Sequence, residues 1–300
     1  MSLQRITKHD DRFRAAVVMM IIAQLSSGLA SCTTVEPTRT VAGSGGVSIA
    51  YDVAGSGNTA LILVHGWSCD RSYWREQVAA FATNYRVITI DLGGHGASPA
   101  HRDDWSIESF GQDVAAVANA VDADNLVLVG HSMSGPVVLD AALRLGDRVA
   151  GIVGVDTHKD VSAGPLSPDR AEAMFSVYAE DFPTKMEALA RRVFFTDRTP
   201  PALIDRVARD MAAGDAVVAR KAGVGMARYD VRAALRQLDG VPLVLINADH
   251  GSTDEAALKA VYPDVRVIVI PDSGHFVMLE RPAAFNAALQ IELDRLSLSE

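Results

Sequence analysis

Six short, almost uninterrupted apolar runs recur along this 300-residue chain, and they constrain its fold more than any other feature. Runs this short do not suit helices, and consecutive apolar side chains indicate strands that are covered on both faces. The runs are Leu61–Val64, Tyr85–Ile90, Leu126–Val129, Val149–Val155, Leu243–Ile246 and Val265–Ile270. A further strand, Val47–Val53, follows a glycine-rich turn, and Thr38–Ala42 before that turn is placed to pair with it as a hairpin.

Helical patterns separate these strands. One of them has Ser106 as its N-cap and apolar residues at helical spacing, namely Ile107, Phe110, Val114, Val117 and Val121. Another begins at Pro282, which suits the first turn of a last helix. The alternation predicts an α/β fold with a mostly parallel sheet wrapped by helices. Ligands of such sheets bind beyond the carboxyl ends of the strands.

The strongest chemical signal is the segment Gly130–Gly135, with the sequence GHSMSG. It directly follows the strand Leu126–Val129 and opens the helical run Pro136–Leu145. A serine on such a sharp strand-to-helix turn needs small neighbours, and the turn exposes the hydroxyl beside a helix N-terminus that favours developing negative charge. The fifth position of the G-x-S-x-G pattern holds Ser134 instead of glycine, which is a mild departure because serine is also small. The segment predicts a nucleophile at Ser132.

Two further segments lie at strand ends. His65-Gly66-Trp67 follows the strand Leu61–Val64 and places a backbone N–H where an oxyanion would need a donor. The segment Asp91–Ser98, with the sequence DLGGHGAS, follows the next strand. Both segments therefore belong to the edge of the sheet that the serine turn occupies.

These segments together resemble the α/β-hydrolase superfamily, whose members carry an HG element, a D-x-x-G-H-G-x-S loop and the nucleophile turn in this order. The resemblance implies the α/β-hydrolase fold, with a mostly parallel eight-stranded sheet flanked by helices and a helical cap insertion. It also implies that Ser132 is the nucleophile and that the N–H groups of Met133 and Trp67 form the oxyanion hole. His65 and His95 match loop positions of the family and are interpreted as residues that support turns.

The general base is expected last in the chain, because the order of the triad is serine, acid, histidine. His275, within Ser273-Gly274-His275-Phe276 after the strand Val265–Ile270, fits this order. The remaining histidines show no ligand spacing, so we expect no metal site, and nothing in the sequence calls for a cofactor. After the N-terminal segment, they are His101, His131, His158 and His250.

Three aspartates compete for the role of the acid, which orients the histidine and stabilises its cation. In most members of the superfamily an aspartate lies in the turn after the penultimate strand, and here Asp249 is nearest to that strand end. Asp249 is therefore the first choice. Asp156, at the end of Val149–Val155, occupies an alternative acid position that some members use. Asp254 is a third option, although it also suits the N-cap of a helix at Glu255–Val261.

Residues 157–237 leave the strand rhythm and become helical, which predicts a cap inserted into a hydrolase core of residues 41–156 and 238–300. By the resemblance, the cap covers the serine and shapes the substrate pocket. The candidates for pocket lining, besides Trp67 and Met133, are Met174, Phe175, Phe194 and Met226. Apolar stripes in an acidic cap favour a small or medium uncharged substrate.

The predicted function is that of a serine hydrolase that cleaves carboxylic esters through an acyl-enzyme. Thioesterase, lactonase, amidase, C–C hydrolase and perhydrolase chemistry stay open, because fold alone does not choose among them. A second hypothesis is a ligand-binding protein that keeps the scaffold without the chemistry. It is motivated by the irregular acid turn and by Ser134. A formal charge of -9 disfavours nucleic acid as a partner.

The N-terminal segment predicts a lipid anchor. Residues 1–14 are rich in basic side chains, and Ala15–Ala30 then run without a charge, as in a signal peptide. The run is shorter than the roughly 20 residues that span a bilayer. It ends at Leu29-Ala30-Ser31-Cys32, which resembles the bacterial lipobox and implies cleavage after residue 31 and lipidation of Cys32 in the cell envelope. Residues 32–40 would then be a tether. The sequence does not indicate an oligomeric state.

Overall fold

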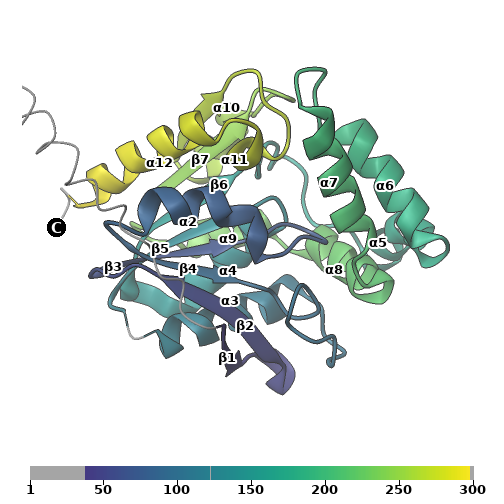
Figure 1. Ribbon diagram of the computed structural model, residues 1–300, viewed down its shortest axis with the longest axis horizontal. Helices are drawn as coiled ribbons and strands as arrows, with labels where there is room; N and C mark the ends of the chain where they lie inside the picture. The colour runs from purple at the N-terminus through teal and green to yellow at the C-terminus, as the bar shows by residue number, and fades with distance from the viewer. Residues whose placement is uncertain (1–37, 122, 298–300) are drawn as a thin grey trace, which may run out of the picture. The chain divides into compact units, whose positions relative to one another are not determined.

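The computed structural model describes residues 38–121 and 123–297, and within them eight strands form one sheet in the order β1-β2-β4-β3-β5-β6-β7-β8 (Figure 1). The strands are β1 (Arg39–Ala42), β2 (Ser48–Ala54), β3 (Thr59–Val64), β4 (Arg86–Ile90), β5 (Asn125–His131), β6 (Val149–Val155), β7 (Leu243–Ala248) and β8 (Arg266–Ile270). Strand β2 pairs antiparallel with both β1 and β4, and all other pairs are parallel. The predicted mostly parallel, eight-stranded α/β-hydrolase sheet is confirmed.

The first two strands form the hairpin that the sequence predicts. Arg39 pairs with Tyr51 and Ala42 with Ser48. The connecting turn has Gly45 at φ 65° and Gly46 at φ 75°, a backbone conformation that glycine adopts without a steric cost. The predicted signal peptide, lipobox and Cys32 lie outside the described residues, and of the predicted tether at 32–40 only residues 38–40 are described. Arg39 and Thr40 belong to β1.

Helices cover both faces of the sheet. They are α2 (Arg75–Phe81), α3 (Ile107–Ala120), α4 (Ser134–Leu145), α9 (Val231–Gln237), α10 (Glu255–Val261), α11 (Val277–Glu280) and α12 (Pro282–Ser297). Helices α3, α4 and α9 pack on one another, and α2, α11 and α12 form a second group. The sheet lies between these two groups (Figure 1). None of the helices in the described part of the chain is long and apolar enough to cross a membrane.

Between β6 and β7 the chain forms the helices α5 (Pro168–Phe175), α6 (Phe182–Val193), α7 (Pro201–Ala212) and α8 (Ala216–Arg228). Helix α5 packs on α8, and α6 packs on α7 (Figure 1). We call these four helices the cap. The next helix, α9, packs against α4 of the sheet layers. The cap helices are amphipathic, and their apolar stripes are buried around Met186, Val207 and Met211.

A buried ion pair ties the hairpin to the helix layer. Arg102 donates to both carboxylate oxygens of Asp113, over 2.8 and 2.7 Å, and both side chains are almost fully buried. The guanidinium lies 4.8 Å from the ring centres of Trp105 and Phe110. Asp113 also accepts the backbone N–H of Ser44 in the hairpin turn, over 2.9 Å. The pair therefore joins β1 and β2 to α3.

Replacing Arg102 by Met should lower the free energy of unfolding by about 3–5 kcal/mol, because the carboxylate of Asp113 would stay buried without its cation. Urea unfolding followed by circular dichroism measures the change. The matched control is Arg75→Met, whose side chain is 62% exposed beside Glu76 and should change stability by less than about 0.5 kcal/mol. Equal losses in the two variants would contradict a special contribution from the buried pair.

Candidate active site

The turn between β5 and α4 holds Ser132 in a strained conformation. Its φ is 54°, a region that costs a non-glycine residue about 1–3 kcal/mol. Its N–H donates to the carbonyl of Val155 on β6 over 2.9 Å. Its own carbonyl accepts the N–H of Gly135 and the hydroxyl of Thr157, both over 2.9 Å. Three hydrogen bonds, to β6, to α4 and to the loop after β6, therefore over-determine the serine backbone and offset its strain.

The small residues of this turn are required by close backbone packing. A Cβ on Gly130 would lie 2.1 Å from the carbonyl oxygen of Ser134, and one on Gly135 would lie 2.3 Å from Thr157 Oγ1. Serine at position 134 also has a task of its own, because its hydroxyl donates to the carbonyl oxygen of His65. The departure from the usual glycine thus ties the serine turn to the loop after β3.

His275 lies between the serine and a carboxylate. Its Nε2 is 2.8 Å from Ser132 Oγ, and its Nδ1 is 2.6 Å from Asp156 Oδ2. The backbone N–H of His275 donates to the carbonyl of Phe194 over 2.7 Å, and the Phe194 ring stacks on the imidazole with centres 4.7 Å apart. Phe194 follows helix α6, so one residue at the end of a cap helix contacts both the backbone and the imidazole ring of His275.

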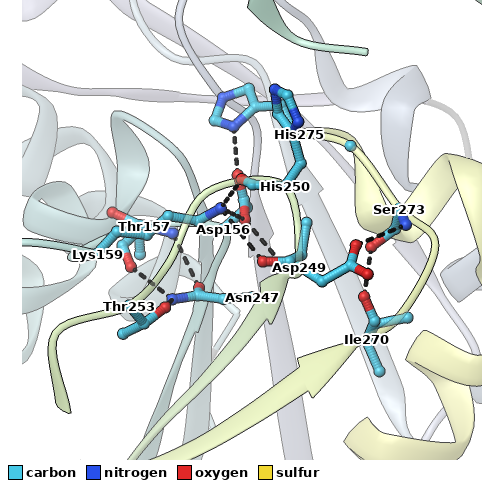
Figure 2. Close-up of polar contacts among 12 residues, drawn as sticks. Asp156, Thr157, Lys159, Asn247, Asp249, His250, Thr253, Ile270, Ser273 and His275 are labelled. Atoms are coloured by element: carbon cyan, nitrogen blue, oxygen red, sulfur yellow. Dashed lines mark hydrogen bonds and ion pairs between the residues drawn. The ribbon is translucent and has the colours of Figure 1, made fainter. Parts of the chain in front are cut away.

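The first choice for the acid, Asp249, is corrected by this geometry. Its carboxylate faces away from His275 and accepts the backbone N–H groups of Asp272 and Ser273, over 2.8 and 3.1 Å (Figure 2). These hydrogen bonds lower the pKa of Asp249, which is exposed. The third option, Asp254, caps α10 by accepting the N–H of Ala257 over 2.9 Å. Asp156, the alternative acid position, is the aspartate that contacts the histidine.

The reason for the correction lies in the backbone at the two strand ends. Strand β7 continues two residues beyond the predicted Ile246, and Asp249 still donates its N–H to Ile270 of β8 over 3.2 Å. Its side chain therefore stays on the β8 side. Asp156 has φ 43°, which turns the chain sharply at the end of β6, the strand next to β5.

Asp156 is buried, yet it is held as an anion. Burial raises its pKa, but the hydrogen bond and charge of His275 and the charge of Lys159 outweigh that effect, so the pKa is lowered overall. Oδ1 accepts the N–H of Ala248 over 2.8 Å and lies 2.8 Å from Lys159 Nζ. Lys159 is a residue of the site that was not expected from the sequence. Its spacing of three residues from Asp156 is the signal that could have indicated it.

Three other histidines near the site are buried and neutral, because burial lowers their pKa. The pKa falls to about 4 for His65 and to about 3 for His95 and His131. His65 accepts the N–H of Leu92 over 3.1 Å, which supports the loop after β4. His131 donates from Nε2 to the carbonyl of His275 over 2.9 Å. The structure thus places these side chains as supports of the turns around the serine.

The expected oxyanion donors lie at the ends of β3 and β5. Within the described residues, neither the Met133 nor the Trp67 backbone N–H donates to a protein acceptor. The Trp67 indole donates to the carbonyl of Ala219 on α8 over 2.8 Å, and its ring packs edge-on against Phe175 and Tyr178. The loop that carries one donor is therefore also attached to the cap.

Two cavities meet at Ser132. One, of about 330 Å³, lies between the cap and the sheet and is mostly apolar. All four cap residues expected in the pocket line it, and they are Met174, Phe175, Phe194 and Met226. The other, of about 250 Å³, has a mixed polar and apolar lining that includes the loop after β6, and Ser132 and Met226 border both cavities. Within the described chain, no cluster of three or more His, Cys, Asp or Glu side chains is arranged to hold a metal ion.

Comparison with known proteins agrees with the geometry. Residues 59–282 match the model of the alpha/beta hydrolase fold family. The chain belongs to this family. A solved thermophilic esterase from Thermogutta terrifontis superposes with a TM-score of 0.76 at 25% identity, covering 87% of this chain and 99% of the esterase.

Curated relatives cover most of the chain. It is 29% identical over 251 residues to the dihydrolipoyllysine-residue acetyltransferase component of the acetoin cleaving system of Pseudomonas putida, which covers 79% of this chain. The chain spans only 64% of that relative's length. It is 24% identical over 243 residues to 3-oxoadipate enol-lactonase 2 of Acinetobacter baylyi, which covers 79% of this chain and 90% of the relative.

The two aspartates should differ sharply in their effect on Ser132. Asp156→Asn should slow labelling of the serine by a fluorophosphonate on the order of 10⁴-fold, because the histidine loses the partner that orients it. Asp249→Asn, with the same change in charge and shape, should slow it by less than about tenfold, since that side chain only supports a neighbouring turn. Labelling rates from mass spectrometry decide the matter, and a larger effect at Asp249 would refute the assignment.

Proposed function

We propose that this protein is a serine hydrolase that cleaves carboxylic esters through an acyl-enzyme. The observation that carries the proposal is the continuous chain of hydrogen-bonding groups from Asp156 through His275 to Ser132, with distances of 2.6 and 2.8 Å. Such a chain matches what a serine needs to act as a nucleophile at neutral pH.

The geometry defines a role for each group. His275 donates its Nδ1–H to Asp156, which leaves the lone pair on Nε2 directed at the serine hydroxyl. Ser132 Oγ attacks the ester carbonyl while Nε2 takes its proton, and the N–H groups of Met133 and Trp67 receive the negative charge on the carbonyl oxygen. The imidazolium then protonates the leaving alcohol. A water molecule, activated by the same imidazole, releases the acid and restores the serine.

The cavities support a small or medium uncharged substrate. A volume of about 330 Å³ is at the lower end of the range of about 300–1,000 Å³ that small-molecule sites occupy. Its apolar walls suit an acyl chain, and the second cavity at Ser132, which is the more polar of the two, suits a more hydrophilic leaving group. The esterase and the enol-lactonase among the similar proteins support acyl transfer to water. Lactones and thioesters undergo the same attack and remain alternatives of this proposal.

The alternative of a binding protein without chemistry loses its motivation. It rested on the irregular turn at Asp249 and on Ser134. Asp156 supplies a carboxylate to the histidine, and Ser134 has a hydrogen-bond partner in the loop after β3.

The proposal is tested with p-nitrophenyl esters of increasing acyl length. We expect hydrolysis with an optimum at short to medium acyl chains. Ser132→Ala should lower kcat on the order of 10⁵-fold or more, because only the oxyanion donors and substrate binding would then contribute to the rate. Equal activity in the wild type and in Ser132→Ala would overturn the proposal. Leu189→Trp, which fills part of the apolar cavity, extends the same series.

The Leu189→Trp variant should move the optimum to shorter esters and lower kcat/KM for the longest good substrate at least about tenfold. The control is Val217→Trp, an exposed cap position that does not line the cavity, and it should keep the wild-type profile. An unchanged optimum in Leu189→Trp would place the acyl chain elsewhere.

We also propose that the mature chain is attached to a membrane of the cell envelope through lipidated Cys32. The lipobox-like residues 29–32 after an uncharged run support this, and several acyl chains would anchor the protein stably. Expressed with its full N-terminus in a bacterial host, the wild type should be found in the membrane fraction and Cys32→Ala should not be acylated. The control Cys69→Ala alters a buried thiol and should fractionate like the wild type. A wild type without acyl groups would refute the anchor.

A further inference from the structure

Lys159 binds the carboxylate of Asp156 on the side that faces away from His275. Its Nζ lies 2.8 Å from Asp156 Oδ1, the oxygen that does not face His275 (Figure 2). The same ammonium donates to the carbonyls of His250 and Ala248, over 2.6 and 3.3 Å. All three donor positions of the lysine are therefore directed at acceptors, and its side chain is only 22% exposed.

We propose that Lys159 is a positioning residue for the hydrolytic reaction, which holds the carboxylate of Asp156 in place and limits the negative charge that this carboxylate presents to His275. The inference rests on the proposed function, since it assigns a role within the same site. The contact between Lys159 and the carboxylate is possible because the acid, Asp156, lies at the end of β6, three residues before the lysine. The carbonyls that the lysine binds belong to the last residue of β7 and to the turn after it, on either side of the first-choice acid, Asp249.

The two loops are joined without the lysine, which points to a role in charge rather than in folding. Asn247 accepts the N–H of Thr157 over 3.1 Å and donates to the carbonyl of Thr157 over 3.2 Å (Figure 2). Asn247 also donates to Thr253 over 2.9 Å. These bonds, together with the N–H of Asp254 that donates to the backbone carbonyl of Lys159 over 2.7 Å, join the two turns without the lysine side chain. The ammonium adds a positive charge beside a carboxylate that is almost fully buried.

The sign of the electrostatic effect follows from the charges that face His275. Asp156 favours the imidazolium, and Lys159 on the far side of the same carboxylate disfavours it. His131 from β5 is neutral. From α11, Glu280 accepts the N–H groups of Gly274 and Phe276 on either side of the histidine.

The remaining charged neighbours lie on the β8 side. Asp249 binds the backbone before the histidine, and Asp272 pairs with Arg198. The ammonium of Lys159 is bonded to none of these side chains, and its charged partner is Asp156. Removal of the lysine charge should therefore let the imidazole of His275 take up a proton at a higher pH. In acidic solution a smaller fraction of the enzyme would then hold the neutral imidazole that acts as the base.

The test is the pH dependence of kcat/KM in three variants of the full chain. Lys159→Met and Lys159→Gln both remove the charge, and Gln keeps a hydrogen-bond donor, whereas Lys159→Arg keeps the charge. We expect the acidic limb of the profile to move to higher pH by about one unit in Lys159→Met and Lys159→Gln, and to stay near that of the wild type in Lys159→Arg. The control is Lys259→Met on α10, which removes an exposed lysine paired with Glu255 and should leave the limb unchanged.

Three results would overturn the inference. One is an acidic limb in Lys159→Met and Lys159→Gln that coincides with the limb of the wild type and of Lys259→Met. Another is an acidic limb in Lys159→Arg that shifts as far as in Lys159→Met, because the lysine would then act through packing. The third is failure of both neutral variants to fold, which would make the lysine structural.

A wild type without ester hydrolysis would refute the proposed function separately. In that case the same variants are compared by NMR titration of the His275 imidazole, which needs no turnover. An upward shift of the titration midpoint in Gln but not in Arg would still support the role of Lys159, and no shift would overturn it.

Discussion

The positive φ of Ser132 is the constraint on which the rest of the site depends. A non-glycine residue keeps this conformation only where its surroundings over-determine it, and here β6, α4 and Thr157 all bond its backbone. The glycines around the serine have no room for a Cβ. The hydroxyl is consequently presented at the carboxyl edge of the sheet. Packing of the core elements thus stores the strain that makes the serine accessible.

The triad-like arrangement draws its members from three places along the sheet. Ser132 follows β5, Asp156 follows β6, and His275 follows β8 and reaches back across the sheet edge. The acid follows β6, which is adjacent to the strand that carries the serine, β5. It therefore lies one strand nearer to the serine than an acid after β7 would. It leaves the turn after β7 free for another use, and there Asp249 supports the loop that carries the histidine. Two aspartates in similar turns therefore serve different purposes, because their backbones direct the carboxylates to opposite sides.

The cap is coupled to this site by hydrogen bonds as well as by apolar packing. The carbonyl of Phe194 holds the backbone of His275, and the carbonyl of Ala219 holds the indole of Trp67. One contact fixes the base, and the other fixes the loop of an expected oxyanion donor. Movement of the cap would thus affect both sides of the serine at once. Phe194, His275 and Trp67 also line the apolar cavity between cap and sheet, which links access of the substrate to the geometry of the site.

The sequence by itself determined the sheet, the serine turn and the order of the chemical segments. Apolar runs such as Leu61–Val64 can only be satisfied between two helix layers, and small residues such as Gly130 are demanded by a local turn, so both signals are written in neighbouring residues. The cap residues Met174 and Phe194 were also recognisable as pocket candidates, because the resemblance to α/β-hydrolases implies a cap that covers the serine. Only the tertiary structure decided between Asp249 and Asp156. That choice depends on the backbone angles at two strand ends and on which neighbours accept or donate there, and such contacts join residues about 120 positions apart. The role of Lys159 depended on the same choice, because its charged partner is Asp156 and the two carbonyls that it also binds lie about 90 residues further along the chain.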